Sequence, residues 1–183
     1  MKLSNPFKKA DKGIKLDVAC GQNKREGFLG VDIAPGPGVD FVWDLEQFPW
    51  EPFADNSVKE IHVSHYAEHT KDLMKFMNEI YRICEDGAKI TILGPYYTSI
   101  RCWQDPTHTR ALSEATWLYY QKPWREANKL SHYPITCDFE VTNMVMFFNE
   151  PWNQKSEEAK RFAIQHYWNV VSDILVELKA KKI

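Results

Sequence analysis

Short runs of alternating apolar and polar residues follow one another through the first half of the chain, a pattern typical of β-strands. The strands that this alternation predicts cover residues 14–19, 28–33, 39–43, 60–64 and 89–93. Residues 34–38 hold two prolines and two glycines, which exclude a helix. Residues 20–27, between the first two strands, are too few for the crossover helix that parallel strands usually need. The helices between the early strands are therefore predicted to be shortened or missing.

Helical spacing is clear in two later stretches. Residues 71–84 carry apolar side chains three and four positions apart, which predicts a helix with one apolar stripe, ended by Asp86-Gly87. Its apolar positions are Leu73, Phe76, Met77, Ile80 and Cys84. Residues 156–181 show the same spacing and predict one long amphipathic helix.

Between these helices the periodicity is lost and aromatic residues are frequent. Residues 95–136 predict an irregular segment, within which Ser113 is a candidate cap for a helix over 114–121. Residues 137–141 and 143–148 alternate again and predict two antiparallel strands around a turn. The aromatic side chains have two interpretations: a lid that stacks on a flat or sugar-like acceptor, or the apolar cover of a small sheet.

Composition narrows the function classes. The chain has 183 residues and a net charge of −2, without any block of like charge, so affinity for a nucleic acid backbone is not expected. No apolar run is long enough to span a membrane. Residues 2–12 are predicted to be a loose leader, and the basic start of the chain lacks the apolar centre of a secretory signal. The four cysteines are scattered, which predicts neither zinc nor a redox pair and favours a reduced, cytoplasmic protein.

Candidate chemistry lies in residues 16–32. The first predicted strand runs into Gly21, and the second ends in an acid, Asp32. Glycine lets backbone N–H groups approach a ligand, because it has no Cβ. A carboxylate at the tip of the second strand is placed to accept both hydroxyls of a ribose. The pattern favours a nucleoside site.

Residues 16–21, Leu-Asp-Val-Ala-Cys-Gly, together with Asp32 resemble the first two motifs of the class I S-adenosylmethionine-dependent methyltransferases. Later segments resemble further motifs of this family in the expected order: Trp43-Asp44-Leu45, 53–69, 79–83 and 87–92. The resemblance covers residues 14–110. The chain departs from the family at Ala19 and Asn23, which stand where the first and third motif glycines are expected.

The resemblance implies a fold and a domain organisation. The expected fold is an α/β, Rossmann-like methyltransferase sheet that is mostly parallel and has a C-terminal antiparallel hairpin. Residues 1–183 are expected to form a single domain, with 95–136 as a substrate-side insertion or lid.

The resemblance also implies S-adenosylmethionine as the cofactor. The cofactor-binding residues it implies are Asp17, Ala19, Cys20, Gly21, Asp32, Ile33, Asp44, Leu45 and His65. Asp17 would orient the amino-acid end of the cofactor, although it is also suited to bracing the glycine turn. Asp44 would accept from the adenine amino group and Leu45 would pack on the ring, but Asp44 is equally a turn or helix cap.

Candidate catalytic residues follow the fourth and fifth strands. Glu68 or His69 would serve as a general base, unless Glu68 only caps the next helix. Asp105-Pro106-Thr107-His108 and Arg110 resemble a motif of small methyltransferases: His108 would deprotonate an acceptor hydroxyl and Arg110 would hold an anionic substrate. The alternative is a loop stabilised by its own side chains. The substrate-side aromatic candidates are Tyr96 and Tyr97. The spacing of Asp105, His108 and His69 does not support a metal site, so none is predicted.

These features predict O- or N-methylation of a small-molecule or glycan-type acceptor by direct in-line transfer. Ser64-His65-Tyr66-Ala67 stands where methyltransferases acting on base amino groups carry an Asn/Asp-Pro-Pro-aromatic signature. Three alternatives stay open: a nicotinamide-dependent oxidoreductase, a nucleoside-binding module without turnover, and an RNA methyltransferase.

Overall fold

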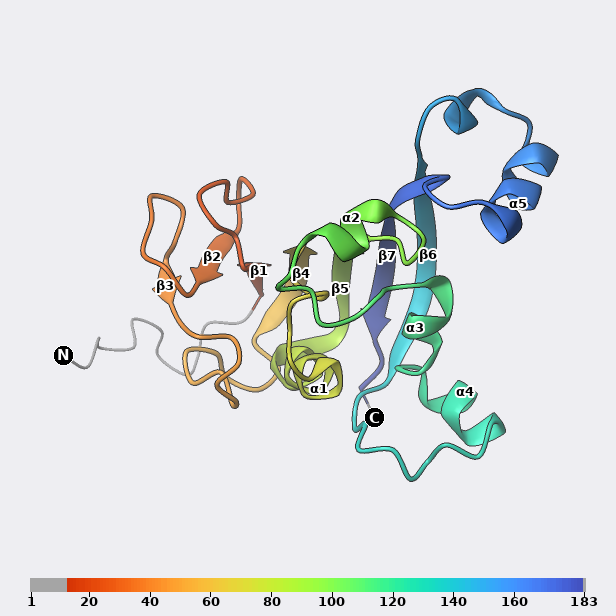
Figure 1. The fold of residues 1–183 in the computed structure, drawn as a ribbon. Coiled ribbons are helices and arrows are strands. Elements are labelled where there is room, and N and C mark those ends of the chain that lie inside the picture. Colours follow the sequence, from red (N-terminus) through yellow and green to blue (C-terminus); the bar gives the residue numbers. More distant parts are fainter. Residues whose placement is uncertain (1–12, 183) are drawn as a thin grey trace.

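A computed structural model describes residues 13–182, so the predicted leader at residues 2–12 lies outside the described part (Figure 1). The chain forms a seven-stranded sheet in the order β3-β2-β1-β4-β5-β7-β6. The strands are β1 (Ile14–Val18), β2 (Leu29–Asp32), β3 (Phe41–Val42), β4 (Val58–Ser64), β5 (Cys84–Pro95), β6 (Phe139–Phe148) and β7 (Val171–Ala180). The α-helices are α1 (Leu73–Ile83), α2 (Ile100–Gln104), α3 (Glu114–Leu118), α4 (Lys122–Ala127) and α5 (Glu157–His166), with a 3₁₀ turn at Trp152–Gln154.

The sheet is parallel from β3 to β5, and β7 runs antiparallel to both β5 and β6. The mostly parallel sheet with a C-terminal antiparallel hairpin is therefore confirmed. Because parallel neighbours end at the same edge, the carboxyl ends of the first five strands lie together, and Asp32 and Ser64 close two of them. Every candidate cofactor residue lies at or next to this edge.

The two faces of the sheet differ in polarity. Two apolar rows cross β1, β4, β5 and β7 in register and are almost fully buried: Leu16, Ile61, Ile90, Leu178, and Val18, Val63, Ile92, Val176. The opposite face carries two rows that are mostly polar: Lys15, Glu60, Lys89, Lys179, and Asp17, His62, Thr91, Glu177. Lys15 and Glu60 pair at 2.7 Å.

Helix α1 packs on the apolar face through Phe76, Met77 and Ile80, all fully buried in the same core as the apolar rows. Asp72 caps it by accepting from the Lys75 N–H at 3.0 Å. Within residues 13–182, the loops linking the first four strands contain no helix. The connections between the early strands therefore lack helices, as predicted. The polar rows need no apolar layer over them, so this face of the sheet is stable without covering helices.

Residues 95–136 form α2, α3 and α4. The helix predicted over 114–121 ends earlier, at Leu118, and α4 begins at Lys122. Pro123 lies in the first turn of α4 and has no N–H to continue an earlier helix, which separates the two.

Two predictions for the C-terminal part are wrong. Residues 137–148 do not form a two-stranded hairpin, because β6 is one strand with a register shift after Val141 and pairs with β7. Residues 156–181 do not form one helix: α5 ends at His166, Asn169 adopts φ 59°, and β7 follows. The buried positions of β7 largely alternate, since the strand fills the space between β5 and β6.

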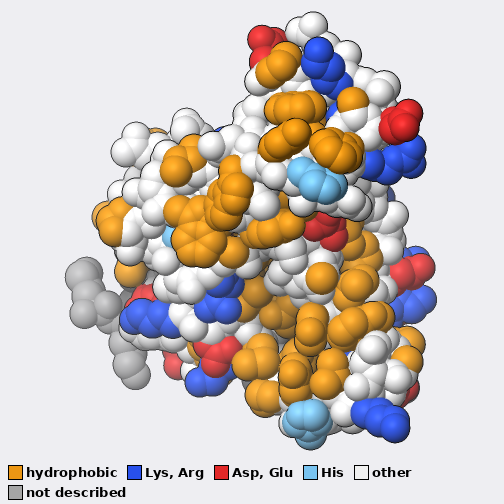
Figure 2. All heavy atoms as spheres, turned by 45° about the vertical axis from the view of Figure 1, so that its right-hand side comes forward, with side chains coloured by type: hydrophobic (Ala, Val, Ile, Leu, Met, Phe, Trp, Pro, Cys, Tyr) orange, Lys and Arg blue, Asp and Glu red, His pale blue; other side chains and the backbone are white. Residues whose placement is uncertain are grey.

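The segment that carries α5 projects from the sheet (Figure 1), and the space-filling view shows hydrophobic side chains on a protrusion there (Figure 2). On this projection, Phe162, Tyr167 and Trp168 are each at least half exposed. Asn169 anchors it to the start of α2: its N–H donates to the Thr98 carbonyl at 2.9 Å, and its side chain accepts from the Ile100 N–H at 2.6 Å.

Candidate active site

The turn after β1 passes over the tip of β2. Ala19 and Gly21 adopt positive φ values of 55° and 54°, so the chain bends sharply there. The Cys20 N–H donates to the Val31 carbonyl at 3.2 Å and ties the turn to β2. The turn that was expected to hold the cofactor therefore lies beside the ribose acid candidate.

Asp17 and Asp32 hold the two ends of this turn. Asp17 is buried; its Oδ2 accepts from the Arg25 N–H at 2.7 Å, and its Oδ1 lies 2.9 Å from Nδ1 of His62. Asp32 accepts from the Gly21 N–H at 2.9 Å. The bracing role considered for Asp17 is thus present in the structure, and both carboxylates border one turn.

The carboxylates of Asp17 and Asp32 affect the pKa of Cys20. Burial, followed by the negative charges of Asp17 and Asp32, raises the pKa of the Cys20 thiol to about 11. The thiol therefore stays protonated at neutral pH, and Cys20 takes part as a neutral wall of the turn.

The other cofactor candidates differ in exposure. Ile33 is 66% exposed at the end of β2, an unusual place for an isoleucine and a suitable one for a ring to cover. Asp44 accepts from the Glu46 N–H at 3.0 Å, so it caps its own turn. Leu45 is buried in the core, and its carbonyl accepts from the Trp50 indole at 3.0 Å.

An acidic rim surrounds the Tyr66 hydroxyl, which donates to Glu46 at 3.2 Å. Burial, then Glu46, and more weakly Asp44 and Asp32, raise the pKa of Tyr66 well above its usual range. Three carboxylates therefore converge at this edge, Asp32 from the end of β2 and Asp44 and Glu46 from the loop after β3. A cationic ligand rich in hydrogen-bond donors suits such a rim, whereas a diphosphate does not.

Next to the rim, a pocket of about 190 Å³ opens past the ends of β4 and β5. It is lined by His65, Glu68, His69, Pro95, Arg101, Gln104, Asp105 and His108. His65 adopts φ 54°, in the left-handed region that only a few per cent of non-glycine residues occupy. The pocket gathers all three predicted catalytic residues, together with His65, which was predicted to bind the cofactor.

Three side chains converge in this pocket. Glu68, His69 and His108 each offer an atom within 4.8 Å of the other two, and the histidine rings meet edge to face at 4.6 Å. Glu68 is fully buried, and neither of its carboxylate oxygens has a hydrogen-bond partner; His65 Nδ1 lies 3.3 Å from Oε1. The structure thus places a buried carboxylate and two imidazoles around one space.

The predicted substrate residues lie outside the lining of this pocket. Tyr96 is buried, and its hydroxyl lies 3.0 Å from both carboxylate oxygens of Glu114. Tyr97 is 38% exposed. Arg110 donates to the backbone carbonyls of Thr70 and Lys71. Within the structure, Arg110 therefore fixes the loop that carries the catalytic candidates.

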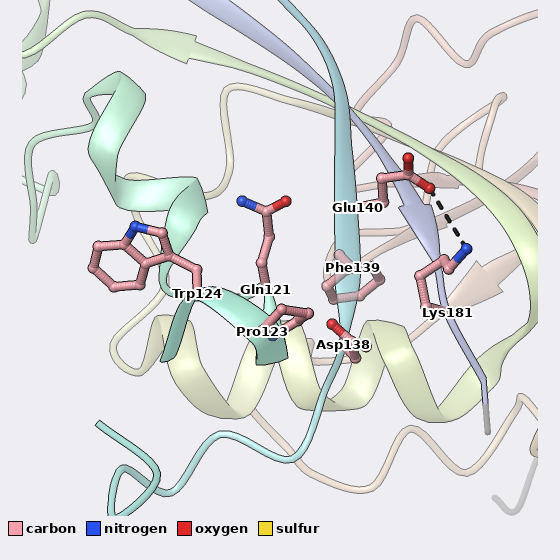
Figure 3. Close-up of a pocket in the computed structure, with 7 residues that line it drawn as sticks. All are labelled: Gln121, Pro123, Trp124, Asp138, Phe139, Glu140 and Lys181. Atoms are coloured by element: carbon pink, nitrogen blue, oxygen red, sulfur yellow. Dashed lines mark ion pairs between the residues drawn. The ribbon is translucent and has the colours of Figure 1, made fainter. Parts of the chain in front are cut away.

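A second pocket, of about 400 Å³, lies at the opposite edge of the sheet (Figure 3). The lining residue Lys181 follows Lys179, which pairs with Lys89 near the amino end of β5. At the carboxyl end of β5, Pro95 pairs with Asp173. Glu140 and Lys181 form an ion pair at 3.7 Å on the side of the pocket that β6 and β7 make. This pocket contains none of the predicted site residues, so its size does not make it the active site.

Sequence reasoning missed three contributors to the site. His62 pairs with Asp17, Glu46 belongs to the acidic rim, and Arg101 lines the pocket of Glu68, His69 and His108. Because side chains alternate along strand 60–64, His62 was expected on the face of the sheet opposite Ile61 and Val63. This alternation could have indicated that His62 lies on the face of Asp17. Arg101 lies on a helix of five residues that leaves no periodic pattern.

Comparison with known proteins decides the family. Residues 16–92, from β1 to β5, match the family model described as "Methyltransferase domain". Residues 16–92 are therefore a class I, S-adenosylmethionine-dependent methyltransferase domain. No curated protein sequence matches the chain.

Solved structures share the fold of this methyltransferase. A SAM-dependent methyltransferase from Archaeoglobus fulgidus has 20% identity and a TM-score of 0.56, covering 92% of this chain and 87% of that one. One from Mesorhizobium loti has 12% identity and a TM-score of 0.55, covering 92% of both chains. The [4+2]-cyclase SpnF has 14% identity and a TM-score of 0.57, covering 94% of this chain and 77% of that one. At these identities the likeness establishes the fold.

The residues at the edge fit S-adenosylmethionine, which the methyltransferase family implies. The cofactor carries an ammonium, a sulfonium, a ribose diol and an adenine amine, and the rim offers the carboxylates of Asp32, Asp44 and Glu46. Ile33 supplies an exposed apolar surface beside them. The same rim argues against the nicotinamide alternative, because a dinucleotide brings a negatively charged diphosphate.

No helix within residues 13–182 is long and apolar enough to cross a membrane.

Proposed function

We propose that this methyltransferase methylates an oxygen or nitrogen of a small-molecule or glycan-type acceptor by direct in-line transfer. One observation supports the proposal: His65 lines the same pocket as Glu68, His69 and His108, and it directly precedes Tyr66, whose hydroxyl lies among the carboxylates of the acidic rim. A donor site and an acceptor site must touch for a single displacement, and these neighbouring residues would bring the two together.

The residues take distinct roles in this proposal. Asp32 accepts from the ribose hydroxyls, Ile33 and Leu45 border the adenine, and Asp44 accepts from its amino group. Asp17 holds the turn of Ala19, Cys20 and Gly21 in place beside the amino-acid end.

S-adenosylmethionine supplies a methyl group already activated by the sulfonium, so the chain has to position the acceptor and remove its proton. His65 borders the methyl group on the pocket side. Glu68, His69 and His108 provide the basic groups that take a proton from an acceptor O–H or N–H. Tyr97 and Arg110 remain the proposed residues of the acceptor side, with Tyr96 supporting Tyr97 from below.

A small acceptor fits this site better than RNA. The pocket holds about 190 Å³, which suits a ring or a sugar-sized group. The net charge is −2, and the rim beside the pocket is acidic. Both features disfavour a polyanionic substrate.

Calorimetry with S-adenosylmethionine and S-adenosylhomocysteine tests the cofactor site. Asp32→Asn should weaken both affinities at least about tenfold, because a charged hydrogen-bond acceptor typically contributes about 1.5–3 kcal/mol. The exposed Glu51→Gln is the matched control and should leave binding unchanged. Equal affinity in wild type and Asp32→Asn would remove the assigned ribose site.

Transfer of a labelled methyl group tests the acceptor class. Phenols, sugars and small amines are compared with RNA oligonucleotides, using the wild type and His108→Gln. Labelling of a small acceptor, reduced in the variant, is expected. Labelling of RNA alone would overturn the proposed acceptor class while leaving the cofactor site intact.

A further inference from the structure

The pocket of Glu68, His69 and His108 has a second property that a general base does not need. Each side chain offers one donor atom within 4.8 Å of the other two. Donor atoms around a transition-metal ion with bonds of about 2.0–2.2 Å lie roughly 3–4.4 Å apart. Small side-chain rotations would therefore bring the three onto one ion.

Glu68 provides the independent observation. Its side chain is fully buried and lines the pocket; neither oxygen accepts a hydrogen bond, and His65 Nδ1 lies 3.3 Å from Oε1. A buried carboxylate that accepts no hydrogen bond is costly unless a cation compensates it. A Cβ on Gly94 would lie 3.0 Å from Oε2, so the backbone packs closely on one side and the pocket is the open side. The orphaned oxygens thus point to a cationic ligand.

The hydrogen bonds of the two histidines leave their Nε2 atoms available. His108 Nδ1 lies 2.9 Å from the Cys102 carbonyl, which only accepts, so Nδ1 carries the proton. Thr107 donates its hydroxyl to Asp105 at 2.6 Å and therefore accepts from His69 Nδ1 at 2.9 Å. Metal-binding histidines are typically oriented in this way, with the other ring nitrogen donating to a carbonyl or to a carboxylate-linked group.

We infer that Glu68, His69 and His108 bind one divalent transition-metal ion. Two imidazoles and one carboxylate, with positions left open toward a pocket, are the donor set of catalytic Zn²⁺ sites and of related Fe²⁺ and Co²⁺ sites. Asp105, whose Oδ2 lies 4.0 Å from His108 Nε2, adds a second negative charge beside the ion. The spacing argument against a metal considered only Asp105, His108 and His69, and it did not include Glu68, which lies next to both histidines in the structure.

The ion would act on the acceptor, and this role rests on the proposed function. An acceptor hydroxyl on an open position would lose its proton at lower pH, with Glu68, His69 and His108 then serving as ligands in place of bases. The proton leaves to solvent, the oxygen–methyl bond forms, and the sulfur–methyl bond breaks. Binding of the ion itself does not depend on methyl transfer.

Metal titration of the chelator-treated full chain tests the inference. Zn²⁺ is followed by calorimetry and Co²⁺ by its visible absorption. One equivalent should bind, and a His69→Ala/His108→Ala double variant should lose at least about a hundredfold in affinity. His132→Ala, at an exposed histidine away from the pocket, is the matched control and should bind like wild type. Equal affinity of wild type and double variant would overturn the site.

Glu68→Gln separates a ligand from a structural residue. Without metal, the variant should melt at or above the wild-type temperature, because it removes a buried charge that accepts no hydrogen bond. With Zn²⁺, wild type should gain thermal stability and Glu68→Gln should gain little. Loss of stability in the variant with no Zn²⁺ effect on wild type would contradict the inference. Calorimetry with S-adenosylhomocysteine on the same metal-free samples measures cofactor affinity without the metal. Failure of the metal site can therefore be distinguished from failure of the proposed methyltransferase function.

Discussion

Two residues at the carboxyl ends of the parallel strands have backbone conformations that glycine would adopt more easily. Ala19 and His65 have φ values of 55° and 54°, and each follows a parallel strand. The left-handed region costs an L-residue roughly 1–2 kcal/mol, which such sites retain where a turn must aim groups at a ligand. The sequence indicated the departure at Ala19, because a glycine is expected there. It gave no sign of the strain at His65, which depends on how the loop after β4 is packed.

Substitution of Ala19 tests this strain. Ala19→Gly should keep or raise the free energy of unfolding by up to about 1 kcal/mol, since relief of the strain is partly offset by chain entropy. Ala19→Val should lower it by about 1–3 kcal/mol, because a β-branched residue is poorly tolerated at positive φ. Urea denaturation measures both, with Ala34→Val, at an exposed alanine, as control. A fully stable Ala19→Val protein would contradict the turn geometry.

The pH dependence of Cys20 tests the placement of the two acids. Since its pKa is raised to about 11, alkylation of Cys20 should be slow at pH 8 and accelerate until about pH 11. Asp32→Asn removes one of the negative charges that raise this pKa, so alkylation at pH 8 should become faster. Mass spectrometry of the Cys20 peptide gives the rate, and Glu51→Gln is the control. An unchanged rate in Asp32→Asn would place Asp32 away from the thiol.

At the scale of elements, helix and strand signals compete in the last thirty residues. Positions 171, 175 and 178 are apolar and fit a helical period, but β7 places Leu175 and Leu178 on opposite faces of the sheet. Leu178 lies in a buried apolar row and Leu175 in a half-buried position. The choice between the two structures depends on β5 and β6, which flank β7 and are distant in sequence. For the same reason the single strand β6 was predicted as two.

Paired alanine substitutions distinguish the two structures. Leu178→Ala should lower the free energy of unfolding by about 2–5 kcal/mol, the range for a buried leucine. Leu175→Ala should cost markedly less, because its side chain is partly solvated. A helix with the spacing of residues 156–181 would put both on one face and give similar costs. Denaturant titrations of the two variants supply the comparison.

At the scale of the molecule, the ordered motifs of β1 to β5 predicted the parallel part of the sheet and the site edge. Each motif consists of one strand and the residue that ends it. Because these residues are neighbours in the chain, the motif can be read from a single sequence. The insertion of β7 between β5 and β6 is a long-range pairing without a local signal. The convergence of Glu68, His69 and His108 has the same origin, since two loops must be packed before they meet.

Excision of the α5 projection tests whether it is separate from the sheet. Asn149 donates to the Val170 carbonyl at 3.0 Å, so an Asn-Gly turn replacing residues 150–169 would close β6 and β7 into a direct hairpin. The shortened chain should melt a few degrees lower, because the Asn169 anchor is lost, and should bind S-adenosylhomocysteine within about threefold of wild type. A deeper excision through Asp173, the partner of Arg101 at 2.6 Å, should impair both. Failure of the first excision to fold would make the projection part of the core.

The shortness of β3 determines how this molecule responds to its ligand. Only Phe41 and Val42 pair with β2, and Asp32 and Asp44 lie at the ends of these neighbouring strands. A nucleoside held by both carboxylates would bridge the ends of β2 and β3 and stabilise the pairing of these two strands. Amide hydrogens of this outer strand should therefore exchange fastest in the empty protein and slow down most when S-adenosylhomocysteine is added.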